Sequence, residues 1–405
     1  MRKNLNQDAF HPIVRGVAQA GVRVANERAV MTLIAGNPGC SNADIARITG
    51  LGPQTTARIL ADLEERDLVR RGALLRGRRG QPATPYRLNP EGAYSLGVEI
   101  GWRHAEVLLF SMAGQVLARR RHAYPFPEVE TLFARLAADI ETVLSGLAPA
   151  QRERITGLGL AMPGTFGEAL ARLGASPAQI AAWAGFDPVA RLAGMTGHFV
   201  HRVNDGNAAA WGEIAFHATP RPSGFAYLHI GTFIGAGLVI EGNLWDGPGG
   251  NAADLGATIA VSRDGQPTFP HLAASLFALG ECLERAGLRP AEPDPARWDW
   301  RTLEPVLGGW IEDAGHVLAQ AAMTARALAE VDVVVIGGEL PQAVLGRLMQ
   351  AMRASLHALP PLGHGLPEIK PGQLGASAGA IGAAQLVFFR SFFSRVWDVF
   401  EAPLA

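Results

Sequence analysis

Residues 203–213 read VNDGNAAAWGE, a polar pair followed at once by a run of small residues. Asp205 stands directly before Gly206, Asn207 and three alanines, so its carboxylate suits the N-cap of a helix over 206–217. Two glycine-rich stretches follow, GTFIGAG at 231–237 and GNAADLG at 250–256. These three stretches lie in the middle of an alternating pattern of strands and helices.

The pattern has the same order on both sides of the central stretch. Before it we expect a three-strand meander, a helix and a buried strand, over residues 94–101, 105–110, 115–118, 128–147 and 155–161. After it we expect two strands, two long helices and an apolar strand, over residues 224–231, 234–241, 271–286, 302–329 and 331–336. The repeated order predicts an α/β body at 91–405 with two lobes and a cleft between them. The lobes span about 91–215, with the C-terminal helix returning to it, and about 216–385.

The charge of the chain is divided between its two ends. Residues 1–90 carry 14 Lys and Arg against 7 Asp and Glu, whereas the remaining 315 residues carry 22 against 30. The total of −1 conceals this division. A basic segment at one end indicates contact with a polyanion.

Residues 1–90 have the pattern of a winged helix-turn-helix DNA-binding domain. Apolar spacing predicts helices over 26–34, 42–49 and 53–66, with Ser41 as the N-cap of the second and Ile45, Ala46 and Ile48 facing inward. The third helix is the expected recognition helix, and its exposed half offers Gln54, Thr55, Thr56 and Arg58 to DNA. Two short strands enclose a loop at 72–84 whose Arg76, Arg78 and Arg79 form the expected wing contacts. A structural cap or a protein-binding module remains the alternative.

Bulk properties exclude several classes of protein. Apolar residues make up 48% of the 405 residues and charged residues 18%, as in ordinary globular proteins. Cys40 and Cys282 are far apart and in no metal or redox spacing, which is typical of a reduced compartment. The N-terminus shows no signal peptide, and no stretch is apolar enough to span a bilayer. We therefore expect a cytoplasmic protein.

The chain resembles the ROK family of repressors, open reading frames and kinases, which has the two-lobed actin/hexokinase-like (ribonuclease H-like) ATPase fold. The resemblance covers nearly the whole chain and includes the winged-helix domain of the repressor branch. It rests on the three central stretches, on Gly337-Gly338-Glu339 and on the closing helix segment LGASAGAIGA at 374–383. It implies that a sugar contacts Asn204, Asp205, Asn251, Asp254 and the turn at Gly164. For Asp205, capping without ligand contact remains open.

Two departures from the family pattern bear on chemistry. The first phosphate loop of the kinases appears here as EIGWR at 99–103, so Trp102 replaces a glycine and Arg103 a hydroxyl residue. A bulky side chain there obstructs the backbone N–H groups that phosphates need, so we expect neither ATP binding nor kinase activity. Ala257 stands where the family has a zinc-binding His, and the cysteines of that motif are missing. We therefore expect no zinc and place His271 at a helix start or on the surface.

The sequence thus predicts a ligand-responsive transcription regulator of carbohydrate metabolism, and we expect a repressor. A homodimer or homotetramer would bind a palindromic operator, and a small sugar, sugar phosphate or polyol would bind the cleft. Two alternatives remain: a ROK sugar kinase with Asp205 as base, and a scaffold that only pairs the DNA-binding domains. The residues 183–187 are expected to line the cleft from the side. The C-terminal apolar run from Leu386 to Trp397 packs on the N-terminal domain, at a subunit interface or in the core.

Overall fold

The computed structural model describes residues 19–73, 84–216, 222–288, 290, 292–360 and 365–394. The chain divides into two compact units. The smaller unit comprises Met1–Glu65, Val69–Arg87 and Phe392–Ala405, and the larger comprises Arg66–Leu68 and Leu88–Ser391. Across the described ranges, no helix is both long and apolar enough to cross a membrane.

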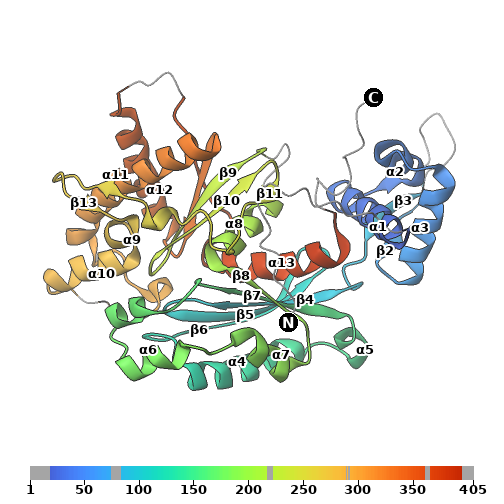
Figure 1. The fold of residues 1–405 in the computed structure, drawn as a ribbon, viewed down its shortest axis with the longest axis horizontal. Helices are drawn as coiled ribbons and strands as arrows, with labels where there is room; N and C mark the ends of the chain where they lie inside the picture. Colours follow the sequence, from blue (N-terminus) through green and yellow to red (C-terminus); the bar gives the residue numbers. More distant parts are fainter. Residues whose placement is uncertain are drawn as a thin grey trace, which may run out of the picture. The chain divides into compact units, whose positions relative to one another are not determined.

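Three helices and a small sheet build the smaller unit (Figure 1, blue). Its elements are α1 (Gln19–Gly36), β1 (Cys40–Ser41), α2 (Asn42–Thr49), α3 (Pro53–Glu65), β2 (Val69–Arg71) and β3 (Pro85–Leu88), with strand order β1-β3-β2. Ser41 caps α2, because its Oγ accepts the Asp44 N–H and the Asp44 carboxylate accepts the Ser41 N–H. This arrangement confirms the predicted winged helix-turn-helix.

The inward face of α2 is narrower than predicted. Ile45 and Ala46 are buried, but the side chain of Ile48 is 47% exposed. The helix ends at Gly50, whose φ of 71° turns the chain away one turn after Ile45. The prediction that Ile48 faces the core is therefore wrong.

The first lobe of the larger unit is a five-stranded sheet in the order β6-β5-β4-β7-β8. Its strands are β4 (Tyr94–Ile100), β5 (His104–Ser111), β6 (Val116–Ala123), β7 (Ile155–Met162) and β8 (Val200–Asn204). The first three form the predicted antiparallel meander, and β7 and β8 add in parallel. The helices of this lobe are α4 (Val129–Leu144), α5 (Pro149–Arg152), η1 (Glu168–Leu173), α6 (Pro177–Trp183) and α7 (Pro188–Thr196).

The second lobe repeats this plan with the strand order β11-β10-β9-β14-β15. Its strands are β9 (Phe225–Ile230), β10 (Ile234–Ile240), β11 (Asn243–Leu244), β14 (Val333–Gly338) and β15 (Glu368–Pro371). Its helices are α9 (Pro270–Ala273), α10 (Leu276–Arg285), α11 (Glu304–Ala329) and α12 (Gln342–His357). A minor ribbon and short turns complete it: η2 (Leu255–Ala257), β12 (Ala260–Val261), β13 (Pro267–Thr268), η3 (Pro295–Arg297) and η4 (Gly375–Ser377). Each lobe has its own apolar core.

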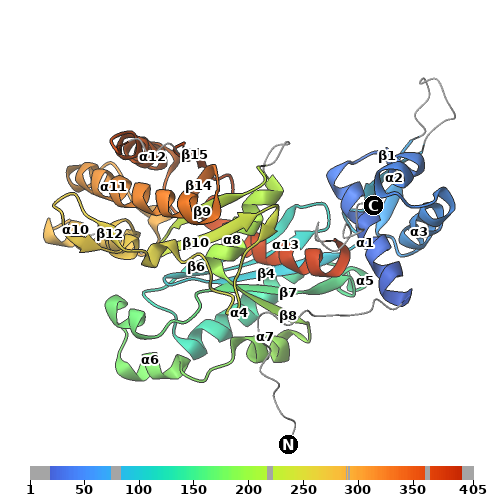
Figure 2. The same cartoon turned by 45° about the horizontal axis from the view of Figure 1, so that its top comes forward.

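Two helices lie between the sheets, α8 (Asp205–Phe216) and α13 (Ala378–Phe392), as both views show (Figures 1 and 2). Their approach to the strands depends on glycines. A Cβ at Gly159 would overlap the Ala383 carbonyl oxygen, and one at Gly382 would overlap the Ala208 carbonyl oxygen. The C-terminal helix is thereby seated against the sheet of the first lobe.

The C-terminal apolar run has two partners. Leu386, Val387 and Phe388 are buried in the larger unit. Beyond the helix, the backbone N–H of Ser394 donates to Thr32 Oγ1 at 2.9 Å within the smaller unit. The core and N-terminal-domain alternatives thus each describe part of this run, and Trp397 lies outside the described residues.

Candidate functional site

A cavity of about 610 Å³ lies between the two lobes of the larger unit. Its polar side chains come from both lobes: Thr165, Arg172, Asn204 and Asp205 from the first, and Asn251, Asp254 and His271 from the second. Its apolar wall consists of Trp102, Phe233, Phe269 and Leu272, with Ala257 beside them. Amide and carboxylate oxygens facing an aromatic wall suit a small polyhydroxylated molecule.

The structure brings all five predicted ligand residues to this one cavity. They lie at the end of β7 (Gly164), at the β8–α8 junction (Asn204 and Asp205) and in the turn before η2 (Asn251 and Asp254). Asn204 Nδ2 donates to Asn251 Oδ1 at 2.9 Å, so the two lobes meet through an amide pair. Gly164 lies against the same amide, because a Cβ there would come within 2.8 Å of Asn251 Oδ1. Ligand contact by these residues stays a prediction.

The cap of α8 involves both residues of the polar pair. Asn204 Oδ1 accepts the Asn207 N–H at 3.1 Å, which is the capping bond, and Asp205 Oδ1 accepts the Gly206 N–H at 2.8 Å. Asp205 also lines the cavity between the lobes. Burial, and then the nearby Glu99 carboxylate, raise the pKa of Asp205 to about 7.

His271 is a cavity residue that sequence reasoning missed. It does lie at a helix start, in α9, but its Nε2 is 3.2 Å from Asp254 Oδ1. Its Nδ1 accepts the backbone N–H of Ile234 at 3.2 Å, so the neutral ring carries its proton on Nε2 and donates toward Asp254. The imidazole therefore reaches the cavity from a segment well beyond Ala257. No spacing in the sequence marks it.

The indole of Trp102 lies between the lobes. Its ring makes edge contacts with Phe166 of the first lobe at 5.1 Å and Phe233 of the second at 5.0 Å. Behind it, a cavity of only about 20 Å³ is bounded by Trp102 and by Glu99, Gly101, His104, Asp205, His229, Gly231, Gly235 and Glu339. A space of this size holds about one water molecule.

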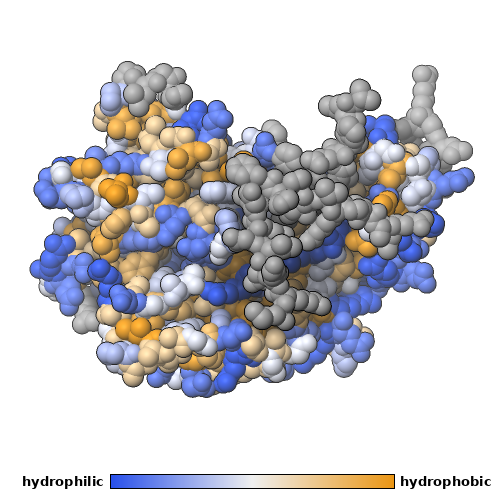
Figure 3. Space-filling view, in the orientation of Figure 1, coloured by the Kyte–Doolittle hydropathy of each residue, from blue (hydrophilic) through white to orange (hydrophobic). Residues whose placement is uncertain are grey.

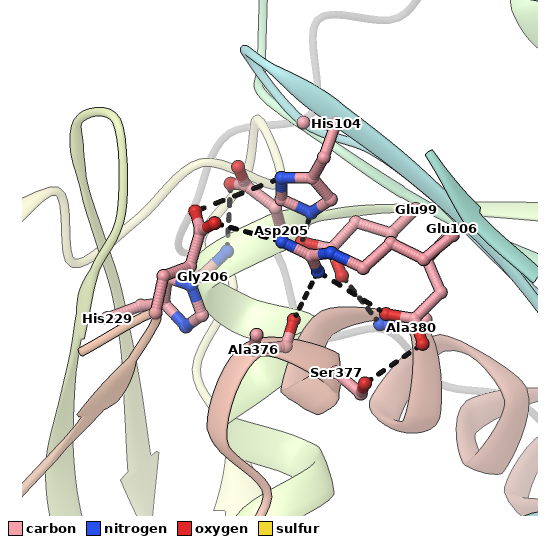
Figure 4. A network of polar contacts seen from close by, with 12 residues as sticks. Glu99, His104, Glu106, Asp205, Gly206, His229, Ala376, Ser377 and Ala380 are labelled. Carbon is pink, nitrogen blue, oxygen red and sulfur yellow. Dashed lines mark hydrogen bonds and ion pairs between the residues drawn. The ribbon is translucent and has the colours of Figure 1, made fainter. Parts of the chain in front are cut away.

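A buried polar network surrounds this small cavity (Figure 4). Arg121 of β6 is paired with Glu339, which follows β14, at 2.9 Å, and it lies 3.6 Å from Glu106 of β5. Arg121 also donates to the carbonyl of Ala376, while Ser377 donates to Glu106 at 2.9 Å. The network therefore joins both lobes and the segment before α13.

The network contains more carboxyl groups than guanidinium groups. Three carboxyl groups, those of Glu99, Glu106 and Glu339, lie near the guanidinium of Arg121, and Glu106 also lies 3.7 Å from Arg119 Nε. Burial lowers the pKa of His104, and it lowers the pKa of His229 to about 3, so neither ring adds positive charge. Burial raises the pKa of Glu99 to about 7, although its carboxylate accepts the Ala380 N–H at 3.0 Å. This region is acidic and densely filled.

The expected DNA-reading side chains lie on α3. Gln54 and Arg58 are exposed, and Thr55 is partly exposed. The expected exposure of Thr56 is wrong: its side chain is fully buried and its Oγ1 donates to the Pro53 carbonyl at 3.0 Å. Thr56 precedes Ile59, Leu60 and Leu63 on the buried stripe of the helix. The wing residues Arg76, Arg78 and Arg79 lie outside the described residues.

Family models match the two parts of the chain separately. The ROK family matches residues 95–284, and a winged helix-turn-helix DNA-binding family matches residues 25–70. The chain carries a ROK domain behind a winged helix-turn-helix. The predicted two-lobed fold and family resemblance are both confirmed.

Relatives of this chain include regulators and enzymes. Protein y4fQ of Sinorhizobium fredii is 29% identical over 374 residues, which are 91% of this chain and 92% of that protein. The xylose repressor of Bacillus spizizenii is 23% identical over 59% of this chain and 61% of its own length. The bifunctional enzyme NanE/NanK of Brucella melitensis is 30% identical over 48% of this chain and 36% of its own length.

A solved structure has the same fold over most of the chain. It is a ROK family transcriptional regulator described as a homologue of the Escherichia coli MLC protein. The match has a TM-score of 0.65 and 20% sequence identity, and it covers 92% of this chain and 98% of that one. The likeness includes the region of the winged helix-turn-helix.

Proposed function

We propose that this protein is a DNA-binding regulator of carbohydrate metabolism that senses a small sugar, sugar phosphate or polyol in the cavity between its lobes. One observation carries the proposal. A recognition helix with exposed Gln54 and Arg58 is joined in one chain to a cavity where Asn204, Asp205 and Asp254 meet. A DNA-binding domain has no role in a metabolic kinase, whereas a regulator needs both parts.

Ligand sensing in this proposal depends on the lobes. Hydroxyl partners come from the first lobe through Asn204 and Asp205, and from the second through Asn251, Asp254 and His271. A ligand that bonds both sides at once stabilises the arrangement in which they approach. It changes DNA affinity only to the extent that it binds one arrangement better than the other.

Kinase activity is the rival that we reject. Transfer from ATP needs a space for the phosphates beside the sugar, lined with donors and a metal. Next to Asp205 the structure has a cavity of about 20 Å³ bounded by Trp102 and several carboxylates. A space of this size cannot hold a triphosphate, so the residues as arranged do not fit a nucleotide. The raised pKa of Asp205 alone would suit a general base, and this is the feature that favours the rival.

The remaining parts of the proposal follow from the regulator role. We propose a repressor that binds a two-fold symmetric operator as a homodimer or homotetramer in the cytoplasm. We further propose that it works without zinc, since Ala257, Asp254 and His271 supply no thiolate to the cavity. Metal analysis of purified protein tests the last point, and a stoichiometric zinc content would contradict it.

Operator binding and ligand response are tested together. Duplexes selected from a random pool by the full chain are labelled, and their affinity is measured by fluorescence anisotropy with and without each member of a sugar library. We expect one class of sugar to change the affinity at least tenfold. Selected duplexes that no sugar affects would indicate the scaffold alternative.

The kinase rival has its own assay. Purified protein is incubated with Mg-ATP and the same library, and ADP release is followed. We expect no sugar-dependent release. Turnover that Asp205→Asn abolishes would establish an enzyme and overturn the proposal.

A further inference from the structure

A second cavity of about 450 Å³ lies within the first lobe, beside the end of β7, η1, α6 and α7. Gly164 and Thr165 line both this cavity and the larger one between the lobes. The two spaces therefore meet at one short segment. A ligand in the larger cavity would therefore contact the smaller cavity at Gly164 and Thr165.

Aromatic rings dominate the wall of the second cavity. The ring of Trp183 lies 4.5 Å from that of Phe166 and 5.6 Å from that of Phe186. Trp183 Nε1 already donates to the Pro127 carbonyl at 2.8 Å, so the indole offers the cavity a ring and no free donor. Aliphatic side chains complete the wall: Met162, Pro177, Ile180, Ala181, Ala184 and Pro188. Figure 3 shows apolar residues at the surface over the region that Figure 1 labels α6.

Polar partners are few in this second cavity. Among the residues that the structure describes, only Thr165, Glu168 and Arg202 bring polar side chains to it. Arg202 Nη2 already donates to the carbonyls of Pro163 and Gly164, at 3.2 and 2.7 Å. A sugar ring has hydroxyl groups all round and would leave several of them without partners here. An apolar ring buries its surface without this loss.

The two cavities therefore differ in the chemistry they accept. The larger one gathers amides, carboxylates and an imidazole, and the smaller one gathers aromatic and aliphatic groups. Phe166 of the smaller cavity packs against Trp183 of the same cavity and against Trp102, which lines the larger one. A molecule with a polar and an apolar half matches this pair of spaces.

We propose that the second cavity binds the apolar, aromatic aglycone of a glycoside whose sugar occupies the larger cavity. This proposal rests on the proposed function, since it needs a sugar in the larger cavity. The polar atoms of the aglycone, such as a nitro or carboxylate group, would meet the remaining N–H groups of Arg202. The effector would then be an aryl glycoside rather than a free monosaccharide.

Matched ligand pairs test the proposal on the full chain. The methyl and 4-nitrophenyl glycosides of each sugar, with the same anomeric configuration, are compared by isothermal titration calorimetry. We expect the nitrophenyl glycoside of the recognised sugar to bind at least tenfold more tightly than its methyl partner. If the methyl and nitrophenyl glycosides of one sugar bind with equal affinity, the proposal for the second cavity is wrong. The proposal that the larger cavity senses a sugar would not be affected.

Two variants on one helix identify where the aromatic ring lies. Ala181 and Ala182 are both exposed on α6, but only Ala181 lines the cavity. Ala181→Trp fills the cavity and is expected to remove the tenfold difference between the two glycosides. Ala182→Trp adds the same indole outside the cavity and is expected to retain the difference. A difference that survives in Ala181→Trp would contradict the assignment.

A probe without sugar separates failure of this proposal from failure of the sugar sensor. Binding of 4-nitrophenol alone is followed by line broadening in ligand-observed NMR. Broadening that Ala181→Trp removes and Ala182→Trp retains would support the cavity even if no glycoside bound. The absence of both glycoside binding and broadening would refute the two proposals together.

Discussion

The ion pair between Arg121 and Glu339 is expected to stabilise the larger unit far more than any exposed pair. It joins β6 of the first lobe to the end of β14 in the second, and its side chains are only 17% and 6% exposed. Glu339→Gln keeps the shape of the side chain and an acceptor oxygen but removes the charge. The variant thus isolates the electrostatic part of the contact.

The expected loss in the free energy of unfolding depends on the partners that Arg121 retains in the variant. Removing one partner of a buried pair costs about 3–5 kcal/mol when the remaining charge has no other partner. Here Arg121 keeps Glu106 at 3.6 Å and the Ala376 carbonyl at 3.3 Å, and the amide of the new Gln still accepts a bond. Losing one of three clustered carboxylates also relieves repulsion. We therefore expect a loss of about 1 kcal/mol, the difference between a charged and a neutral hydrogen bond.

Urea unfolding measures this loss, and Glu312→Gln provides the control. Arg263 and Glu312 form a shorter pair, at 2.6 Å, but their side chains are 50% and 63% exposed. The control is expected to lose less than about 0.5 kcal/mol because water screens the pair. If both variants lost the same small amount, the network would not be shielded from water and the reasoning would fail. Hydrogen exchange should also rise in β14 of Glu339→Gln and remain unchanged there in the control.

Three further predictions concern pH, DNA and ligand. The raised pKa of Glu99, about 7 when folded against 4.5 for an ordinary Glu, contributes stability that is complete below pH 4.5 and lost as the pH rises to 7. Between pH 5 and 8 the wild type should therefore lose up to about 3 kcal/mol that Glu99→Gln retains, as urea unfolding at each pH would reveal. Arg58→Ala should weaken operator binding about tenfold and reduce the slope of log affinity against log salt concentration by about one. Arg87→Ala, outside α3, serves as the comparison. Equal effects of the two substitutions would show that α3 does not contact the DNA. His271→Ala removes the donor beside Asp254 and should weaken effector binding at least tenfold in calorimetry, and an unchanged affinity would exclude the imidazole from the site.

Local patterns predicted much of the fold and the larger cavity. Ser41 lies where a cap must lie, and Asn204, Asp205, Asn251 and Asp254 occur in glycine-rich segments whose spacing is visible in the chain. Their assignment to a sugar came from the family resemblance and not from the spacing alone. In the structure Asn204 and Asp205 follow β8 of the first lobe, whereas Asn251 and Asp254 lie in the turn before η2 of the second. The five predicted ligand residues line one cavity because the two lobes face each other.

Contacts between segments that are distant in the chain could not be predicted from local sequence patterns. Arg121, Glu339 and Ser377 belong to separate elements, and only the stacking of two lobes brings them together. His271 follows a short strand and one proline, with no periodicity to single it out. Thr56 is the opposite case, since its spacing before Ile59, Leu60 and Leu63 could have placed it inside. The hydroxyl group of Thr56 favours an exposed position, but its place on the apolar face of the helix is the stronger indication.

Trp102 lies at the place where the chain departs from the phosphate loop of the kinases. Its indole lines both the larger cavity and the small cavity beside Glu99 and Glu339. Phosphoryl transfer needs the acceptor hydroxyl and the donor phosphate in line within one space. Trp102 also gives the larger cavity an aromatic surface that is supported by Phe166 and Phe233. On the side of the small cavity, Arg121 and Glu339 form an ion pair that joins the two lobes. Under the proposed function, Trp102 therefore both occupies space that phosphates would need and provides an apolar surface for the effector.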